Sequence, residues 1–429
     1  MLEQQPTEST TNFEFHCTLC DAKYSYSKVR LCPKCGGSLE VIYDYEKLKN
    51  LSHSKIPISQ EHLGVWRYLP LLPVSPDMQI VTLGEGGTLV HPLKEDSRTK
   101  LRIRNIFVKD EFRNPTSSFK DRNSTVSITR ALHEGYKRAV AVTAGNAGSS
   151  IAAFSAKAGI ESWVFTMKGI SDAKLAKLLA YGAKVFATEA ETAELISFAR
   201  QVIQKYGREE TLLVQSRYNP YAREGSKTAL FEIYEHFAGK MPDWIAIPIG
   251  SGSNLTAYHK GIKELQELGL ITNSPKLIGV QGALCAPVVE AFEKNLDHTE
   301  RVANPSTIAH SIKDDWAPEG DSALAAIRKT HGQAVGVTDE EIVDAQSFLS
   351  SKEGLFVEPA SAAPLAGVKK LIAENKIDSN ESVLTIATGF GLNQPEVVLS
   401  PNLWKNRTIR LDTLSVEKFA SSLEKSRSI

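Results

Sequence analysis

The stretch Asn114-Pro-Thr-Ser-Ser-Phe-Lys120-Asp-Arg122 joins a strand-like run at residues 106–109 to a helical run that starts near Phe119. This position places the ammonium group of Lys120 at the end of a helix where the dipole disfavours positive charge. A lysine whose pKa is lowered in this way can attack an aldehyde. Because most lysines are solvated surface groups, the stretch alone indicates only a candidate catalytic lysine on a strand–loop–helix unit.

Strand-like and helix-like runs alternate on both sides of this stretch. The strand-like runs lie at residues 138–143, 162–166, 183–188, 212–215, 244–249, 277–281 and 382–387. The helix-like runs lie at residues 149–158, 171–181, 191–206, 224–238 and 338–351. Such alternation predicts an α/β fold with mainly parallel sheets covered by helices. Residues 46–100 are rich in proline and are predicted to be a connector.

Three further motifs each follow an apolar strand-like run. They are Thr143-Ala-Gly-Asn146-Ala-Gly-Ser-Ser150, Gly250-Ser-Gly-Ser-Asn254 and Ala387-Thr388-Gly-Phe-Gly-Leu-Asn393. The first opens a helix and favours an anion such as a carboxylate. The second is typical of a loop that holds one phosphate, since it lacks the Walker and dinucleotide spacings. In the third, Thr388 ends a strand and could hydrogen-bond a heterocyclic nitrogen, although each motif alone is also compatible with an ordinary turn.

The four motifs together are more specific than any one of them. Pyridoxal phosphate requires a lysine for its aldehyde, an anchor for its phosphate and a partner for its ring nitrogen. Lys120, the loop from Gly250 to Asn254, and Thr388 match these needs in turn. The sequence therefore predicts an enzyme that uses pyridoxal phosphate.

Four of the five cysteines lie close together near the N-terminus. Cys17-Thr-Leu-Cys20 and Cys32-Pro-Lys-Cys35 are two C-x-x-C motifs, and Gly36-Gly37 after the second permits the positive φ of such turns. Four thiolates without an open position form a closed, structural zinc site; a redox dithiol pair is the alternative. We predict a zinc ribbon within residues 1–45, after a short disordered lead, and expect the metal to supply its folding energy.

Composition limits the partners and the compartment. Lys plus Arg and Asp plus Glu each total 50, so the formal net charge is zero and no basic field points to nucleic acid or an anionic membrane. No apolar run approaches the roughly 20 residues that span a bilayer, and because the N-terminus is polar without an apolar stretch, we do not expect a secretory signal. The clustered cysteines, with only Cys285 elsewhere, are not typical of a disulfide framework and indicate a cytoplasmic setting.

In the order of its motifs the chain resembles the fold-type II pyridoxal-phosphate family, and within it the threonine synthase branch. The matching motifs are Leu83-Gly-Glu-Gly, Asn114-Pro-Thr-Ser-Ser-Phe-Lys-Asp-Arg, Ala144-Gly-Asn-Ala-Gly, Asn219-Pro-Tyr with Glu224-Gly-Ser-Lys-Thr, Gly250-Ser-Gly-Ser-Asn, Phe356-Val-Glu-Pro-Ala-Ser-Ala-Ala and Thr388-Gly-Phe-Gly-Leu. Some archaeal and bacterial members also carry the zinc ribbon. The resemblance implies a tryptophan-synthase-β-like fold with two open, mainly parallel sheets. It also implies a large cofactor-binding domain at residues 46–125 and 222–429, with a smaller α/β domain inserted at residues 126–221.

The resemblance implies roles for individual residues. Lys120, preceded by Phe119, would bind the cofactor's aldehyde and then act as the general base at Cα and Cβ of the substrate. Asn146 would bond the cofactor's phenolic oxygen and Thr388 its pyridine nitrogen. The cofactor's phosphate would be held by Gly250, Ser251, Gly252, Ser253 and Asn254. The amino-acid substrate would be bound by Thr88, Thr143, Ala144, Gly145, Ala147 and Arg223.

The implied activity is that of a carbon–oxygen lyase, a homodimer that converts O-phosphohomoserine and water to threonine and phosphate. The chain departs from the family pattern at Ala222 in place of arginine, at Phe390 and Asn393 in place of histidine and lysine, and at Lys313-Asp-Asp-Trp316 in place of Ile-Gly-Asn-Pro. These departures leave open the alternative that the chain is a related enzyme acting on another β- or γ-substituted amino acid. Examples are a cysteate-synthase-like enzyme acting on O-phosphoserine, or a dehydratase or ammonia-lyase. A non-catalytic regulatory relative is an alternative of another class.

Several chemically active residues also have ordinary structural interpretations. We expect Cys285 to be a small buried apolar residue rather than a nucleophile. The acidic run with Asp314, Asp315 and Glu319 is predicted to be a solvated loop. Arg223 is either a ligand for a substrate anion or a member of a surface salt bridge.

Overall fold

The computed structural model describes residues 13–25, 30–52, 55–190, 192–207 and 209–400. The chain forms two compact units, Met1–Gln394 and Pro395–Ile429, and the described part of the second consists of the short helix α13 (Glu396–Leu399) and its flanks. The predicted disordered lead lies outside the described residues. Within the described residues, no helix is both long and apolar enough to cross a membrane.

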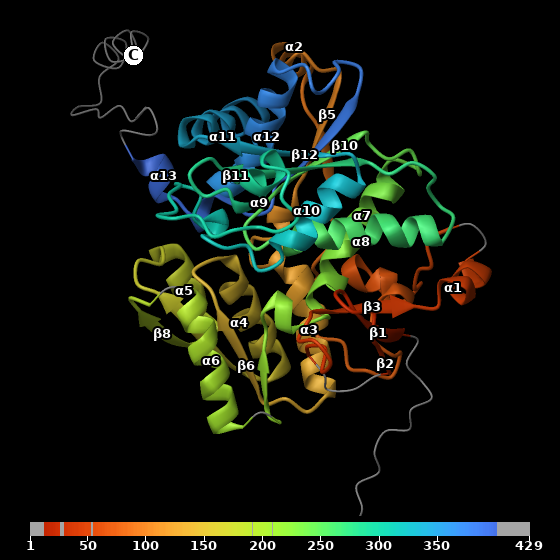
Figure 1. The fold of residues 1–429 in the computed structure, drawn as a ribbon, viewed down its shortest axis with the longest axis vertical. Helices are drawn as coiled ribbons and strands as arrows, with labels where there is room; N and C mark the ends of the chain where they lie inside the picture. The colour runs from red at the N-terminus through yellow and green to blue at the C-terminus, as the bar shows by residue number, and fades with distance from the viewer. Residues whose placement is uncertain (1–12, 26–29, 53–54, 191, 208, 401–429) are drawn as a thin grey trace, which may run out of the picture. The chain divides into compact units, whose positions relative to one another are not determined.

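Three antiparallel strands near the N-terminus form a small sheet in the order β2-β1-β3 (Figure 1). They are β1 (Phe13–Cys17), β2 (Lys23–Tyr24) and β3 (Leu39–Tyr43), and α1 (Tyr45–Ser52) follows. Buried and more exposed residues alternate along β1 and β3, so one face of the sheet packs on the rest of the unit. Phe15, paired with Val41, is fully buried and contacts the ring of Tyr221 at a centroid distance of 5.8 Å.

A six-stranded sheet in the order β12-β11-β10-β13-β5-β4 forms the largest layer. Its strands are β4 (Val90–Pro92), β5 (Asn105–Lys109), β10 (Trp244–Pro248), β11 (Lys276–Gly282), β12 (Gln333–Val337) and β13 (Ser382–Ile386). All neighbours are parallel except β4 with β5. Every residue of β10 is buried, as its unbroken apolar sequence requires for a strand covered on both faces.

Helices cover both faces of this sheet (Figure 1). On one face Ile245 and Ile247 pack with α7 (Ala222–His236), α8 (Ser253–Glu267), α9 (Pro287–Glu293) and α10 (Gly320–Lys329). On the other face Trp244 and Ala246 pack with α11 (Asp339–Glu353) and α12 (Pro359–Ala373). The alternation of β10 side chains thus divides the core into two halves.

A second, four-stranded parallel sheet has the order β8-β7-β6-β9. Its strands are β6 (Arg138–Val142), β7 (Glu161–Met167), β8 (Lys184–Thr188) and β9 (Thr211–Leu213). It is associated with α3 (Lys120–His133), α4 (Asn146–Ala158), α5 (Asp172–Ala180) and α6 (Thr192–Tyr206). Ala139 and Ala141 of β6 pack with α3 and α4, while Val140 and Val142 pack with α6.

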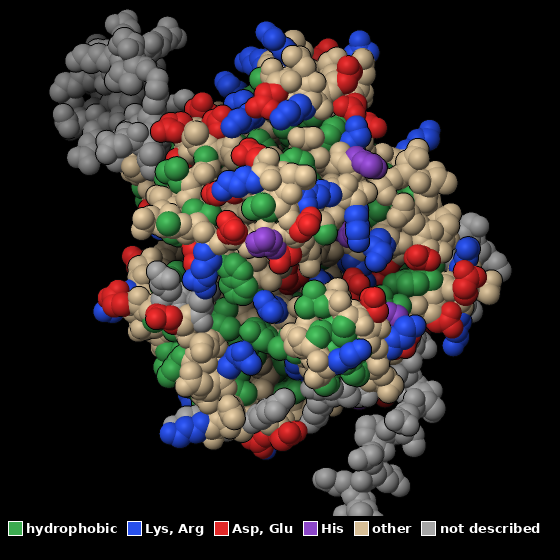
Figure 2. Space-filling view, in the orientation of Figure 1, with side chains coloured by type: hydrophobic (Ala, Val, Ile, Leu, Met, Phe, Trp, Pro, Cys, Tyr) green, Lys and Arg blue, Asp and Glu red, His purple; other side chains and the backbone are tan. Residues whose placement is uncertain are grey.

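The predicted fold class, two open and mainly parallel sheets covered by helices with an N-terminal ribbon, is confirmed. The connector at residues 46–100 proved richer in structure than predicted, since it holds α1, a 3₁₀ helix at Gly64–Leu71, β4, and α2 (Glu95–Leu101). The division into a large and an inserted domain stays a prediction. Figure 2 shows positive and negative side chains interspersed over the visible face, in keeping with the zero net charge.

Candidate active site

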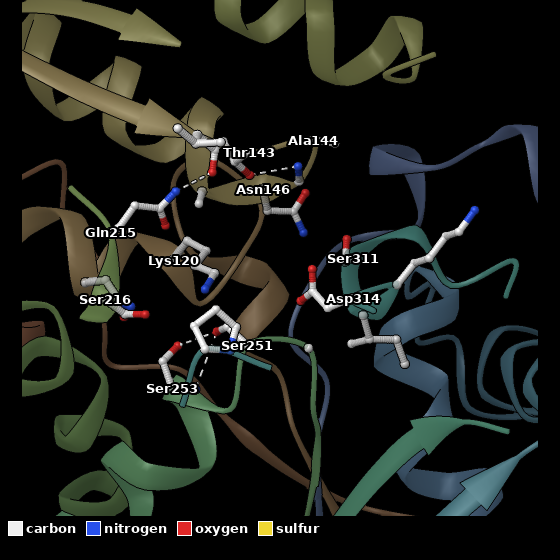
Figure 3. A pocket seen from close by; sticks show the side chains of 18 of the residues that line it. Lys120, Thr143, Ala144, Asn146, Gln215, Ser216, Ser251, Ser253, Ser311 and Asp314 are labelled. Atoms are coloured by element: carbon white, nitrogen blue, oxygen red, sulfur yellow. Dashed lines mark hydrogen bonds between the residues drawn. The ribbon is translucent and has the colours of Figure 1, made fainter. Parts of the chain in front are cut away.

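A cavity of about 490 Å³ opens where the carboxyl ends of strands from both sheets meet, as is usual for ligand sites in open α/β sheets. Its wall includes residues that follow β6, β10 and β13, the start of α3 and the loop at residues 310–318. Figure 3 shows Lys120, Asn146, Ser251 and Asp314 projecting into this space from different elements.

The loop before α3 fixes the position of Lys120, the first residue of that helix. Asp121 accepts hydrogen bonds from the backbone N–H of Thr116 at 2.6 Å and from its hydroxyl at 2.5 Å, which closes the loop on the helix start. The N–H of Phe119 donates to the carbonyl of Thr388 at 2.9 Å. The loop therefore ties the lysine to the end of β13.

The environment of Lys120 favours its uncharged form. Burial lowers the pKa of this amine, and the negative charges of Asp314 and Glu319 oppose that shift only in part. Burial raises the pKa of Asp314 to about 6, against the effect of Lys120. An amine that is less protonated at neutral pH is available as a nucleophile and as a base.

The glycine-rich loop from Gly250 to Asn254 leads into α8, which begins at Ser253. A Cβ on Gly250 would lie 2.9 Å from Asp314 Oδ2, and one on Gly252, whose φ is +90°, would lie 2.7 Å from the carbonyl oxygen of Glu319. Glycine is therefore required for the close approach of this loop to residues 311–320.

The same loop fits a phosphate group. The hydroxyls of Ser251 and Ser253 lie 3.1 Å apart on the pocket wall, at the N-terminus of a helix of fifteen residues. The side-chain amide of Asn254 is buried and has no hydrogen-bond partner at either Nδ2 or Oδ1. Buried polar atoms without partners are costly, so this amide fits a site whose ligand supplies the missing bonds.

Asn146 and Thr388 are each held by a neighbouring side chain. Glu358 accepts from Asn146 Nδ2 at 3.0 and 3.1 Å, and Ser361 Oγ lies 3.0 Å from Thr388 Oγ1. Ser361 also accepts from the N–H of Gly389 at 2.6 Å. These bonds fix both side chains at the pocket wall, as a ring-binding site requires.

The turn between β6 and α4 completes the cavity. The N–H of Gly145 donates to Thr143 Oγ1 at 2.9 Å, and Gln215 Nε2 donates to the carbonyl of Val142 at 2.6 Å (Figure 3). The turn places the N-terminus of α4, which begins at Asn146, beside the pocket. Such a helix start attracts an anion such as a carboxylate.

Comparison with known proteins assigns the family. Residues 81–389 match the family described as pyridoxal-phosphate dependent enzyme. Threonine synthase of Methanocaldococcus jannaschii is 38% identical over 384 residues, which cover 89% of this chain and 93% of that protein. Threonine synthase of Synechocystis is 36% identical over 330 residues, or 77% of this chain and 82% of that protein. The chain belongs to the threonine synthase family of pyridoxal-phosphate dependent enzymes.

Solved structures agree with this family at the level of the fold. Diaminopropionate ammonia lyase from Escherichia coli superposes with a TM-score of 0.64 at 16% identity, over 76% of this chain and 89% of that chain. A mutant of O-ureido-L-serine synthase with bound O-ureido-L-serine gives a TM-score of 0.62 at 17% identity, over 79% and 96%. This member of the threonine synthase family therefore has the fold-type II architecture.

In this member of the threonine synthase family, most of the predicted site residues line one cavity. They are Phe119, Lys120, Thr143, Ala144, Gly145, Asn146, Ala147, Gly250, Ser251, Gly252, Ser253, Asn254 and Thr388. Ala222 lines it as well, whereas Phe390 and Asn393 are not among its lining residues. The roles assigned to these residues stay predictions.

Two residues predicted to bind substrate are placed elsewhere. Thr88 bonds Lys109 Nζ at 2.6 Å and Glu111 at 2.6 Å, within a buried network that also includes Arg122. Arg223 donates to the carbonyl of Leu39 in the ribbon at 2.9 Å. Neither side chain lines the cavity, so we withdraw both from the substrate site.

The acidic run after residue 312 is not a solvated loop, and that prediction was wrong. Glu319 is buried, and Asp314 is partly buried in the cavity wall beside Lys120. Asp315 is half-buried and pairs with the exposed Arg301 at 3.1 Å. Charge patterning along the sequence does not show that this loop folds over Gly250 and Gly252.

Sequence reasoning also missed several lining residues. Gln215, Ser216, Arg217 and Glu358 all face the cavity. Glu358 lies in the quoted motif Phe356-Val-Glu-Pro, which was the available signal for it. The others come from segments that no motif marks, and only the three-dimensional fold brings them to the site.

Proposed function

We propose that this protein is a threonine synthase, a carbon–oxygen lyase that converts O-phosphohomoserine and water to threonine and phosphate. The observation that carries the proposal is one cavity in which a partly buried lysine, a one-phosphate loop and a strand-end hydroxyl converge, in a chain of the threonine synthase family. Pyridoxal phosphate, when bound, supplies the aldehyde and the ring that withdraws electrons from the substrate's Cα.

The residues of the chain would divide the remaining work. Lys120, with its lowered pKa, would carry protons at Cα and Cβ of the substrate. The N-terminus of α4, around Thr143 to Ala147, would hold the substrate carboxylate. Asn146 and Thr388 would orient the cofactor ring, each fixed by its bond to Glu358 or Ser361.

Release of inorganic phosphate from O-phosphohomoserine tests this proposal, with O-phosphoserine run in parallel. We expect the holoenzyme to form threonine and phosphate in equal amounts from the first compound. Ala222 and the segment Lys313 to Trp316 line the cavity and depart from the family pattern, so a second candidate that acts on O-phosphoserine is tested beside the first. Turnover of O-phosphoserine alone would establish that candidate and reject the first.

We also propose that the ribbon binds one structural zinc ion. Sγ atoms of Cys17, Cys20, Cys32 and Cys35 all lie within 4.8 Å of one another. Gly37 closes tightly on this cluster, since a Cβ there would lie 2.9 Å from Cys17 Sγ. Four converging thiolates are typical of a closed zinc site.

Replacement of Cys20 by serine is expected to remove the zinc and to expose the ribbon to proteolysis, because the metal supplies much of the folding energy of so small a module. Metal content per chain and limited proteolysis measure the two effects. Cys285→Ser is the matched control, since this buried cysteine lies outside the cluster. Zinc-free protein with an intact, protease-resistant ribbon would contradict the prediction.

We further propose a cytoplasmic homodimer. The free cysteines of the described chain support a reducing compartment. Sedimentation of the holoenzyme tests the dimer, and a monomer at working concentrations would reject it.

A further inference from the structure

Arg217 is a partly buried arginine of the cavity wall that lacks an anionic partner. It lies in a 3₁₀ helix at Ser216–Tyr218, in the segment that connects β9 to α7. Its Nε atom is buried and makes no hydrogen bond. Among the described residues no carboxylate pairs with it. A partly buried guanidinium group without an anionic partner fits a site that an anionic ligand completes.

The guanidinium group of Arg217 is supported by an aromatic ring. Its Cζ lies 5.9 Å from the ring centroid of Trp316, which also lines the cavity. The other arginine near this ring, Arg301 at 5.8 Å, is already paired with Asp315 at 3.1 Å. Contact with a ring orients the planar fork of an arginine without using its hydrogen-bond donors.

The remaining cations of the cavity wall are less suited to bind the substrate's phosphate. Lys120 is committed to the cofactor in the proposed function, and Lys168 pairs with Glu189 at 2.7 Å. Arg200 and Lys313 are exposed, and Arg200 lies against the ring of Tyr218 at 5.3 Å. An exposed cation gains little from an anion that remains in water, so the partly buried Arg217 is the stronger ligand.

Space for the anion is available on the same wall. Ala222 lines the cavity five positions after Arg217 and projects no further than its Cβ. The next residue, Arg223, has its guanidinium group turned to Leu39 and Glu319, outside the cavity. We propose that Arg217, supported by Trp316, binds the phosphate group of a phosphorylated amino-acid substrate and so determines specificity. This inference rests on the proposed function for the identity of the substrate.

The test uses the holoenzyme and the variants Arg217→Ala and Arg217→Lys. For Arg217→Ala we expect the cofactor's absorption band to be unchanged, while kcat/KM for O-phosphohomoserine falls about 100-fold and inhibition by inorganic phosphate weakens to a similar degree. Arg217→Lys keeps the charge but loses the planar fork, so its kcat/KM for O-phosphohomoserine should fall about tenfold. This variant replaces Arg217→Ala in the test if the alanine variant does not fold. Arg200→Ala, which removes an exposed arginine of the same cavity, is the matched control. Its kcat/KM and its inhibition by phosphate should stay within about twofold of those of the unchanged protein.

Titration of the holoenzyme with inorganic phosphate separates this inference from the proposed function. If the unchanged protein does not act on O-phosphohomoserine, the proposed function fails. A phosphate-dependent change of the cofactor band that is lost in Arg217→Ala would still uphold the anion site. Equal phosphate affinity in Arg217→Ala and the unchanged protein would overturn the inference.

Discussion

Substitution of Lys120 by alanine is expected to abolish the visible absorption of bound pyridoxal phosphate, a band at about 415 nm, because the lysine that would hold the aldehyde is gone. Turnover should fall at least about 1,000-fold, since the same amine would also move protons at the substrate. The loss is large because burial lowers the pKa of Lys120 and makes its free amine available. Absorption spectra and phosphate release measure the two effects.

Two matched variants separate the chemistry of Lys120 from its charge. Lys120→Arg keeps a cation beside Asp314 but offers no amine that forms a stable bond to an aldehyde, so it should lose the band as well. Lys168→Ala removes another lysine of the cavity wall, one that is paired with Glu189, and should keep the band. An unaltered band in Lys120→Ala would show that another residue holds the cofactor.

The fold could be predicted from the sequence because its local signals agree with one another. The apolar run of β10 and the glycines after it together specify a buried parallel strand followed by a helix start. In a parallel sheet such strand ends meet at one edge, and because β10 pairs with β13, Gly250 and Thr388 line the same cavity. The position of Lys120 follows from the same rule. β5, the strand before its loop, pairs with β13, so the loop begins at the same edge of the sheet.

The sequence could not show contacts between segments that have no common periodicity. Thr88 follows the family motif Leu83-Gly-Glu-Gly and was predicted to bind substrate, yet three buried charges, Lys109, Glu111 and Arg122, hold its hydroxyl. Arg217 carries no motif, and its position in the cavity depends on how β9 is connected to α7. These placements arise from packing at long range in the sequence, which local patterns do not encode.

Arg223 shows why a shift of one residue matters. α7 begins at Ala222, and consecutive residues of a helix point about 100° apart. Ala222 faces the cavity, whereas the guanidinium group of Arg223 lies between the ribbon carbonyl of Leu39, at 2.9 Å, and the carboxylate of Glu319, at 3.4 Å. Burial acts to lower the pKa of Arg223, but the charges of Glu319, Glu40 and Glu224 outweigh it and raise this pKa. Arg223 is therefore a buried cation.

Glu319 connects this cation to the glycine-rich loop. Its N–H donates to the carbonyl of Ser251 at 2.8 Å, and its carboxylate accepts from Thr256 Oγ1 of α8 at 3.1 Å. Its other carboxylate oxygen, Oε1, is buried without a hydrogen-bond partner. A buried carboxylate in this state depends on its cation, so the position of the loop that would bind phosphate depends on Arg223 and, through Leu39, on the ribbon.

Substitution of Arg223 by methionine is therefore expected to leave Glu319 buried without its charge partner and to lower the free energy of unfolding by about 3–5 kcal/mol. The dissociation constant of pyridoxal phosphate should rise by about tenfold or more, because the loop at Ser251 loses its support. Urea denaturation and titration of the cofactor band measure these effects.

The double variant Arg223→Met with Glu319→Gln distinguishes support of the loop from binding of substrate. Removal of both charges should recover much of the lost stability and cofactor affinity, because no buried carboxylate is left uncompensated. A residue that bound the substrate would behave differently: KM for the substrate would rise in both variants while cofactor affinity stayed constant. That pattern would return Arg223 to the substrate site, whereas recovery in the double variant would establish that the arginine acts through Glu319 on the phosphate loop.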